Sequence, residues 1–231
     1  MATGVLPVFV GRATRGVEFF EHAEKTYETE LLLGVATDTE DTTGTVLTRR
    51  EVSVTQEQLT EVLERFRGEI MQIPPMYSAL KVNGQKLCDL ARKGRQVERQ
   101  PRPVTIHELT LLSREGDTLR LRVRCSKGTY IRVLAEEIGA VLGVPATLSA
   151  LRRTQAGVFS LEQCHTLPEI LAAAECGELA ANDWVLPIET VFAPLPLPLP
   201  LSFWPQPAIR PSTRTRDNTI ATTFFMYIPS R

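Results

Sequence analysis

The segment from residue 119 to residue 125 constrains the fold more than any other feature of the chain. Apolar side chains occupy every second position from Leu119 to Cys125, and arginines fill the positions between them. Successive side chains of a β-strand point to opposite faces of a sheet, so this pattern predicts a strand with one buried face and one charged face. We expect the strand to end at Lys127-Gly128.

Helical and extended patterns alternate along the rest of the chain. Thr55-Gln56-Glu57-Gln58 is a capping box, and the apolar spacing that follows predicts a helix ending near Gly68. An amphipathic helix is expected from Tyr130 to Leu142, with Gly143 ending it. This mixture favours an α+β fold, with a mixed, mostly antiparallel sheet and flanking helices, over a doubly wound parallel sheet. Further strands are predicted at Lys25–Leu33, Pro103–Leu112 and Arg153–Phe159, and further helices at Arg15–His22 and Pro168–Glu175.

The composition changes near Ala193. A Pro-Leu repeat occupies residues 194–201, and eight of the 16 prolines lie from residue 194 onward. Proline lacks the backbone N–H that a sheet ladder needs, and alternating prolines favour extended polyproline geometry. We therefore expect residues 1–192 to form a folded domain and residues 193–231 to be a Pro-rich, disordered tail.

Composition excludes several classes of protein. The 231 residues carry a net charge of −1, so the chain as a whole is neither a polycation nor a polyanion. No apolar run approaches the roughly 20 residues of a membrane span, and the chain begins without the pattern of a secretory signal. The four cysteines and three histidines are scattered, which favours free thiols over the alternative of a structural metal site. We expect a cytoplasmic protein without metal or cofactor.

One internal stretch is strongly basic. From Lys86 to Arg102 there are six basic residues against Asp89 and Glu98. Basic side chains that neutralise phosphates release counterions, so this stretch is suited to binding RNA. The alternative interpretation is a solvated surface loop.

Six motifs occur in an order that resembles one enzyme family. Any one of them is weak evidence alone, but together they cover roughly residues 1–190. The ordered set is similar to the tRNA pseudouridine synthase B family. The segments are Met1–Pro7, Lys25-Thr26-Tyr27, Gly34–Gly44, Ile73–Gly84, Cys125–Ala135 and Leu151–Phe159.

The first motif carries the family's nucleophile. In the family pattern Asp-Pro-x-Ala-Thr-Gly-Val-Leu-Pro, Met1 occupies the x, so the resemblance implies that the catalytic aspartate lies just before Met1. No catalytic nucleophile is then expected within the chain. Asp38 and Asp41 match other family positions, and we do not expect either to replace the nucleophile. The resemblance also implies truncation at both ends, with the Pro-rich tail in place of the usual C-terminal RNA-binding domain.

The family's reaction is isomerisation of the T-loop uridine of tRNA, at position 55, to pseudouridine. The base is flipped out, its C1′–N1 bond is broken, and it is rejoined through C5, without cofactor or metal. A flipped base needs a surface that replaces its lost stacking. The resemblance assigns Tyr27, Tyr130 and Leu151 to substrate binding and Arg132 to orienting the aspartate. The residues alone also allow a half-buried strand tyrosine, a core leucine and an ordinary surface arginine.

By the same resemblance, the basic stretch is an insertion that closes over the T-arm of tRNA. Phosphate contacts position RNA without reading its sequence. No membrane partner is expected, and no oligomer is implied. The alternative function is that of a catalytically inactive tRNA-binding remnant or a pseudogene product. The expected phosphate contacts come from Arg92, Lys93, Arg95, Arg99 and Arg102.

Overall fold

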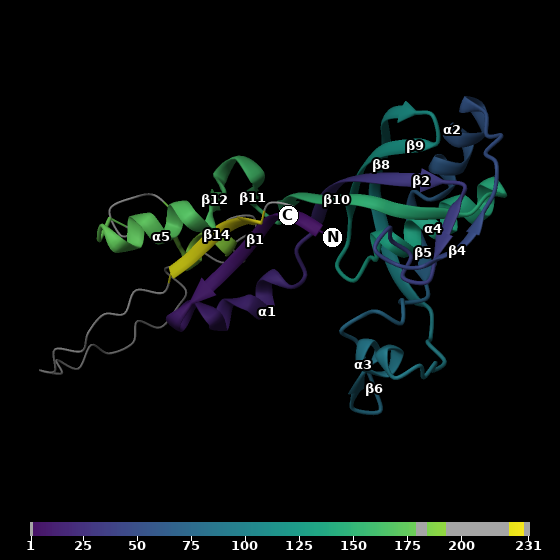
Figure 1. Cartoon of the computed structure of the whole chain (residues 1–231). Helices are drawn as coiled ribbons and strands as arrows, with labels where there is room; N and C mark the ends of the chain where they lie inside the picture. Colours follow the sequence, from purple (N-terminus) through teal and green to yellow (C-terminus); the bar gives the residue numbers. More distant parts are fainter. Residues whose placement is uncertain (1, 179–183, 193–221, 229–231) are drawn as a thin grey trace, which may run out of the picture.

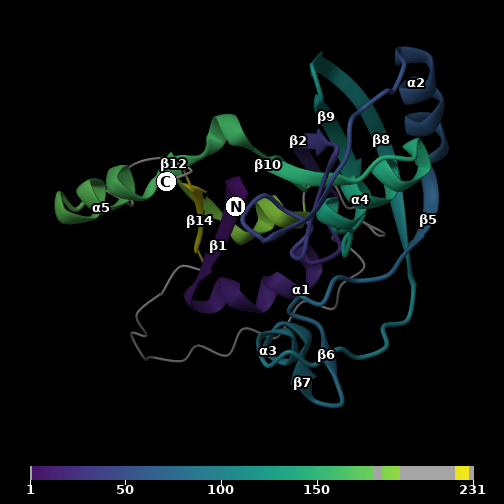
Figure 2. The same cartoon turned by 45° about the vertical axis from the view of Figure 1, so that its right-hand side comes forward.

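The computed structural model describes residues 2–178 and 184–192, together with the backbone of 222–228. Ten strands of the described residues form one sheet, in the order β12-β14-β1-β10-β2-β9-β8-β5, with β11 beside β10 and β13 beside β14. Two lobes are joined along this sheet, and the long strand β10 (Ala146–Ala156) runs from one to the other (Figures 1 and 2). Among the described residues, no helix is long and apolar enough to cross a membrane.

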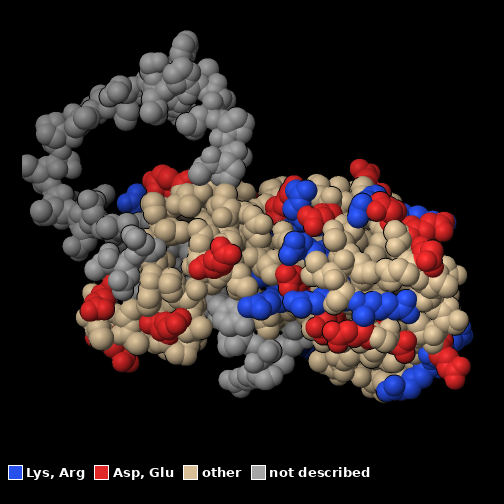
Figure 3. Space-filling view, turned by 90° about the horizontal axis from the view of Figure 1, so that it is seen from above, with Lys and Arg blue, Asp and Glu red and all other residues tan. Residues whose placement is uncertain are grey.

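The larger lobe is built on antiparallel strands. β2 (Lys25–Leu33) pairs with β10 and with β9 (Thr118–Cys125), and β8 (Arg102–Glu115) joins β9 to β5 (Gly68–Gln72). The predicted alternation is confirmed, because the apolar positions of β9 are 0–1% exposed. The arginines between them point to the opposite face, where Arg120 and Arg122 pair with Glu28. Seen from above, basic side chains form a band bordered by acidic ones (Figure 3).

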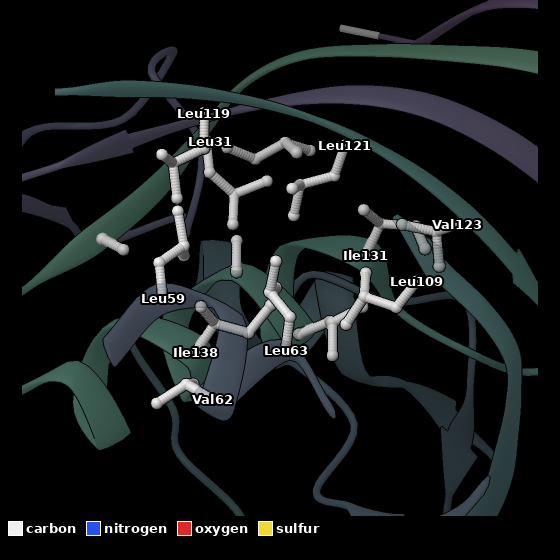
Figure 4. Packing of buried hydrophobic residues seen from close by; sticks show 14 of the residues in the cluster. Leu31, Leu59, Val62, Leu63, Leu109, Leu119, Leu121, Val123, Ile131 and Ile138 are labelled. Carbon is white, nitrogen blue, oxygen red and sulfur yellow. The ribbon is translucent and has the colours of Figure 1, made fainter. Parts of the chain in front are cut away.

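Two helices cover the buried face of these strands. α2 (Gln56–Arg65) begins at the predicted capping box on Thr55, and α4 (Ile131–Leu142) ends at Gly143, whose φ is 76°. Leucine, isoleucine and valine side chains from both helices meet those of β2, β8 and β9 in the main core (Figure 4). Burial of this apolar surface is the main stabilising term for the larger lobe.

The smaller lobe has its own core around Phe159, which is 1% exposed. β1 (Ala2–Val10) lies at its centre, parallel to β10 and antiparallel to β14 (Thr222–Ile228). The remaining elements surround this strand. They are η1 (Gly11–Gly16), α1 (Val17–Phe20), β11 (Phe159–Ser160), η2 (Leu161–Gln163), β12 (His165–Thr166), α5 (Leu167–Glu175), β13 (Val185–Pro187) and η3 (Ile188–Phe192).

Two irregular segments project from the larger lobe. The 38–45 turn joins β3 (Val35–Thr37) to β4 (Val46–Arg49). The 73–101 segment joins β5 to β8 and contains a small hairpin, β6 (Lys81–Val82) and β7 (Gln85–Lys86), followed by α3 (Leu87–Arg92). This segment extends away from the sheet below the larger lobe (Figure 1).

Three sequence-based predictions of structure need correction. The helix expected at Arg15–His22 is a 3-10 turn followed by the four residues of α1. The strand expected at Arg153–Phe159 begins earlier, at Ala146, and ends at Ala156, because its first half pairs with β2 and packs against α4. The prediction of a disordered tail falls largely outside the described residues, but Thr222–Ile228 form β14, in keeping with their threonine and aromatic content.

Candidate functional site

Neighbouring strands place Gly4, Arg153 and Tyr27 in one row across the sheet. Arg153 is the register partner of Gly4 on β1 and of Tyr27 on β2, and Tyr27 is the partner of Val123 on β9. Register partners share a face, so this row lies on the face that buries Val123 against the core. A Cβ on Gly4 would lie 2.1 Å from the Arg153 carbonyl oxygen, and the φ of Gly4 is +102°. Only glycine fits there.

Tyr27 lies half-buried at the edge of the main core. Burial raises the pKa of its hydroxyl, and a hydrogen bond from the Arg153 side chain opposes that shift. Nε of Arg153 also donates to the carbonyl oxygen of Val5 at 2.6 Å. Arg153 therefore ties Tyr27 to β1, the strand that carries the Ala-Thr-Gly-Val-Leu-Pro motif.

Leu151 occupies the next row on the same face. It pairs with Ala2 on β1 and with Thr29 on β2, and its half-buried side chain contacts the edge of the core. Diagonal neighbours on adjacent strands lie roughly 7–8 Å apart, within reach of an aromatic side chain. The fold thus brings together two predicted substrate-binding residues, Tyr27 and Leu151, beside the beginning of β1. A core leucine and a pocket leucine are compatible roles here.

Arg132, in the first turn of α4, links three segments of the chain. Its Nη1 donates to the Thr39 carbonyl oxygen at 3.0 Å and its Nη2 to the Tyr77 carbonyl oxygen at 2.8 Å. Nη1 also lies 3.6 Å from Oδ2 of Asp41. The side chain is 21% exposed and makes contacts with two other segments of the chain. One guanidinium holds the 38–45 turn and the 73–101 segment against α4.

The carboxylate of Asp41 is organised by its own turn. Burial alone would raise its pKa, but hydrogen bonds from Thr43 and Thr39, together with the charge of Arg132, hold the pKa below its usual value. The backbone of Asp41 forms a bridge with Leu148 of β10. Oδ1 of Asp38 instead accepts a hydrogen bond from the Thr45 N–H at 2.7 Å and closes the turn. Asp41 therefore stays ionised beside Arg132, whereas the carboxylate of Asp38 accepts a backbone hydrogen bond within the turn.

Tyr130 is fixed through its backbone at the N-terminus of α4. The Tyr130 N–H donates to Oε1 of Gln72 at 3.0 Å, and Nε2 of Gln72 donates back to the Tyr130 carbonyl oxygen at 3.4 Å. Gln72 is only 1% exposed. Tyr130 itself borders a pocket of about 320 Å³ that also contains Arg102 and Lys127. Apart from the helical bond from the Leu134 N–H, its described hydrogen bonds therefore connect it to β5, and none reaches Tyr27.

The five predicted phosphate contacts do not share one environment. Arg92, Lys93, Arg95 and Arg102 are exposed, and Arg92 pairs with Asp89 at 3.4 Å. Arg99 is half-buried, and its Nη1 donates to the Pro74 carbonyl oxygen at 3.1 Å. This bond joins the two ends of the 73–101 segment, and the partial burial of Arg99 sets it apart from the other four.

Sequence reasoning did not single out Arg153, Gln72 or Glu40. Arg153 lies within the Leu151–Phe159 motif but received no role, because its place beside Tyr27 comes from the pairing of β10 with β2. Gln72 carries no sequence signal, because its importance comes from burial beside a helix terminus. Glu40, in the 38–45 turn, has a φ of 64° and a pKa raised by burial.

Within the described residues, no cluster of three or more histidine, cysteine, aspartate or glutamate side chains could hold a metal ion.

Solved structures define the class of protein. A chain in a Cbf5–Nop10–Gar1 complex matches with a TM-score of 0.59 and 27% identity, covering 79% of this chain and 47% of that chain. A chain from an H/ACA RNP bound to a substrate RNA containing 2′-deoxyuridine shares the fold, with a TM-score of 0.56, 22% identity and coverage of 80% and 51%. The predicted α+β fold of the pseudouridine synthase type is confirmed.

Family models and relatives then narrow the class. The TruB family pseudouridylate synthase N-terminal domain matches residues 1–131, and the tRNA pseudouridylate synthase B C-terminal domain matches residues 132–193. The chain therefore belongs to the TruB family of pseudouridylate synthases, as its motifs predicted.

Two curated relatives indicate how much of the family's length is present. The tRNA pseudouridine synthase B of Pseudomonas fluorescens (strain Pf-5) is 52% identical over 198 residues, which is 85% of this chain and 65% of the relative. That of Azoarcus sp. (strain BH72) is 49% identical over 197 residues, covering 85% and 64%. The chain thus spans about 65% of the length of the curated relatives it matches.

Proposed function

We propose that this chain carries the uridine pocket of a tRNA pseudouridine synthase that isomerises the T-loop uridine at position 55. The proposal rests on which residues of β10 pair with the beginning of β1, and on which residues of β2 pair with those of β10. Ala2 pairs with Leu151, and Gly4 lies beside Arg153 and Tyr27. The aspartate that the family pattern places two residues before Met1 would precede this row along the direction of β1.

Each residue of the proposed site has its own role, and the residues come from β2, β10, β5, α4 and the 38–45 turn. Tyr27 supplies the stacking surface that replaces the stack lost by the flipped uridine, and Leu151 forms the apolar wall beside it. Arg132 orients the nucleophilic aspartate, while Asp41 holds the guanidinium in place from the other side. Tyr130 completes the substrate contacts, and Gln72 fixes its backbone.

The reaction requires no net oxidation or reduction. The C1′–N1 bond breaks, a C1′–C5 bond forms, the proton on C5 leaves, and N1 gains a proton. An acid, a base and a nucleophile suffice in principle. The catalytically inactive RNA-binding alternative uses the same pocket without the aspartate, so binding and conversion have to be measured separately.

The proposed RNA site is tested by binding a 17-nucleotide T-arm stem-loop and a stem-loop with a scrambled loop. Loss of base–aromatic stacking typically costs about 1–3 kcal/mol, so Tyr27→Leu should weaken T-arm binding about tenfold. Tyr27→Phe keeps the ring and should bind within about twofold of wild type, while scrambled-loop binding changes little. Equal affinity of the wild-type chain for both RNAs would rule out T-loop recognition.

A further inference from the structure

Gln72 lies at the foot of the 73–101 segment, where its side chain meets the beginning of α4. It is the last residue of β5 and the register partner of Arg102, the first residue of β8, so the segment leaves the sheet between these two residues. Gln72 is buried. A polar side chain buried in this way is costly unless it has hydrogen-bond partners, so the partners of Gln72 indicate its role.

Both ends of the Gln72 amide contact the backbone of Tyr130. Oε1 accepts a hydrogen bond from the Tyr130 N–H at 3.0 Å, and Nε2 donates to the Tyr130 carbonyl oxygen at 3.4 Å. Tyr130 is the N-cap residue of α4, and its own side chain makes no capping hydrogen bond. The place of Tyr130 therefore depends on a side chain of β5.

Glu137 is the third partner of this amide. It lies on α4 about two helical turns after Tyr130, so the two residues lie on the same side of the helix. The half-buried Glu137 carboxylate accepts a hydrogen bond from the Gln72 side chain. Burial raises the pKa of Glu137, the hydrogen bond from Gln72 opposes that shift, and the charge of Glu136 adds to it.

These three contacts determine which way the amide faces. A glutamine side chain has one acceptor oxygen and an NH2 group with two donor hydrogens. The Tyr130 N–H is a donor, whereas the Tyr130 carbonyl and the Glu137 carboxylate are acceptors, so only one orientation of the amide satisfies all three. A hydrogen bond to an ionised acceptor is stronger than one to a neutral acceptor, so Glu137 contributes most to this choice.

We propose that Glu137 and Gln72 form a positioning relay for Tyr130, in which the carboxylate orients the amide and the amide holds the tyrosine at the uridine pocket. This inference rests on the proposed substrate contact of Tyr130, and it adds two residues that act through Tyr130 and not on the RNA. The relay also ties Tyr130 to the foot of the 73–101 segment, because Gln72 is the residue from which that segment begins.

The test is a double-mutant cycle on binding of the T-arm stem-loop to the full chain, with Kd measured by fluorescence anisotropy. Tyr130→Ala should weaken binding about tenfold, as expected when an aromatic contact to a base is lost. Glu137→Leu and Gln72→Met should each weaken binding about fivefold when Tyr130 is present, and by less than about twofold in the Tyr130→Ala chain. Glu137→Gln keeps an acceptor oxygen and should bind within about twofold of wild type.

Glu136→Leu is the matched control, because it removes the neighbouring, exposed carboxylate of the same helix and should bind the T-arm like wild type. If Gln72→Met does not fold, the Glu137 variants decide. Equal losses for Glu137→Leu with and without Tyr130, or no loss in either chain, would overturn the relay alone. Wild-type affinity in Tyr130→Ala would overturn the relay and the substrate contact of Tyr130. Failure of the wild-type chain to prefer the T-arm over the scrambled loop would overturn the proposed function itself.

Discussion

Nη1 of Arg132 and Oδ2 of Asp41 lie 3.6 Å apart, with both side chains largely buried. Arg132 comes from the first turn of α4, and Asp41 comes from a turn that bridges to β10. The pair therefore connects the helix layer to the sheet within the larger lobe. Its geometry leaves the carboxylate ionised and the guanidinium fixed, which is what an arginine needs in order to orient a second carboxylate.

Asp41→Asn should destabilise the chain by about 1–3 kcal/mol, because it leaves a half-buried guanidinium without its charged partner. The folded-state pKa of Asp41 lies below its usual value. The stabilisation is therefore present above the unfolded-state pKa and is lost as pH falls through the folded-state pKa. Urea unfolding at pH 7 and pH 3 measures the difference between Asp41→Asn and wild type, which should shrink at the lower pH.

The control is Asp89→Asn, in an exposed pair with Arg92, which should cost no more than about 1 kcal/mol. Equal losses for the two variants would contradict the account.

Gly4→Ala tests the close approach of β1 to β10. The new Cβ would collide with the backbone of Arg153 and would also strain a φ of +102°, so we expect a loss of about 2 kcal/mol or more. Gly116→Ala has a φ of +58° but open space around it, and should cost only about 1 kcal/mol. Urea midpoints of both variants at constant m-value give the comparison. A Gly4→Ala chain as stable as Gly116→Ala would mean that the β1–β10 register is different.

Glu40→Gln should stabilise the chain at high pH. Burial raises the pKa of Glu40 to about 7, above its ordinary value of 4.5. The folded state therefore binds more protons than the unfolded state between these values, and wild-type stability falls as pH rises through this window. After allowing for partial exposure, the glutamine variant should be more stable by about 1–2 kcal/mol at pH 8 and equal at pH 4. Glu69→Gln, on the exposed surface of β5, should stay within about 0.5 kcal/mol at both pH values. A pH-independent difference for Glu40→Gln would contradict the buried-carboxyl description.

The salt dependence of RNA binding separates phosphate contacts from pocket contacts. Lys93→Ala and Arg95→Ala each remove one exposed charge from the 73–101 segment. Each variant should lower the slope of log K against log salt by about 0.7–0.9, because each phosphate contact releases condensed counterions. Arg65→Ala, on α2 and paired with Glu61, is the control and should leave the slope unchanged. Unchanged slopes in all three variants would remove the 73–101 segment from the RNA interface.

Sequence patterns correctly predicted those strands and helix ends that depend only on neighbouring residues. The alternation of β9, the capping box at Thr55 and the left-handed Gly143 depend on side-chain period and turn chemistry, and these act over a few residues. The first half of β10 was missed because its short run of alanine, threonine and serine around Leu148 is a weak strand signal. Its pairing with β2, over more than 100 residues of sequence separation, defines it. Element boundaries set by long-range pairing are not visible in a local window.

In the candidate site, too, motifs within a few residues could be predicted and long-range contacts could not. Motifs identified Tyr27, Tyr130, Arg132 and Leu151, and the fold brings Tyr27 and Leu151 onto one face. The partners that hold them could not be read from the chain, because Gln72 and Asp41 act through contacts across 58 and 91 residues of sequence.

Pseudouridine formation at the T-loop uridine tests the central claim most directly. The measurement compares the 231-residue chain with the chain that includes the in-frame residues encoded before Met1, and with an Asp→Asn variant of the expected nucleophile. Carbodiimide modification followed by primer extension reports conversion, and anisotropy reports binding. We predict that all three bind the T-arm and that only the longer chain with its aspartate forms pseudouridine. Conversion by the 231-residue chain that is abolished by Asp38→Ala or Asp41→Ala, or none by the longer chain, would contradict the account.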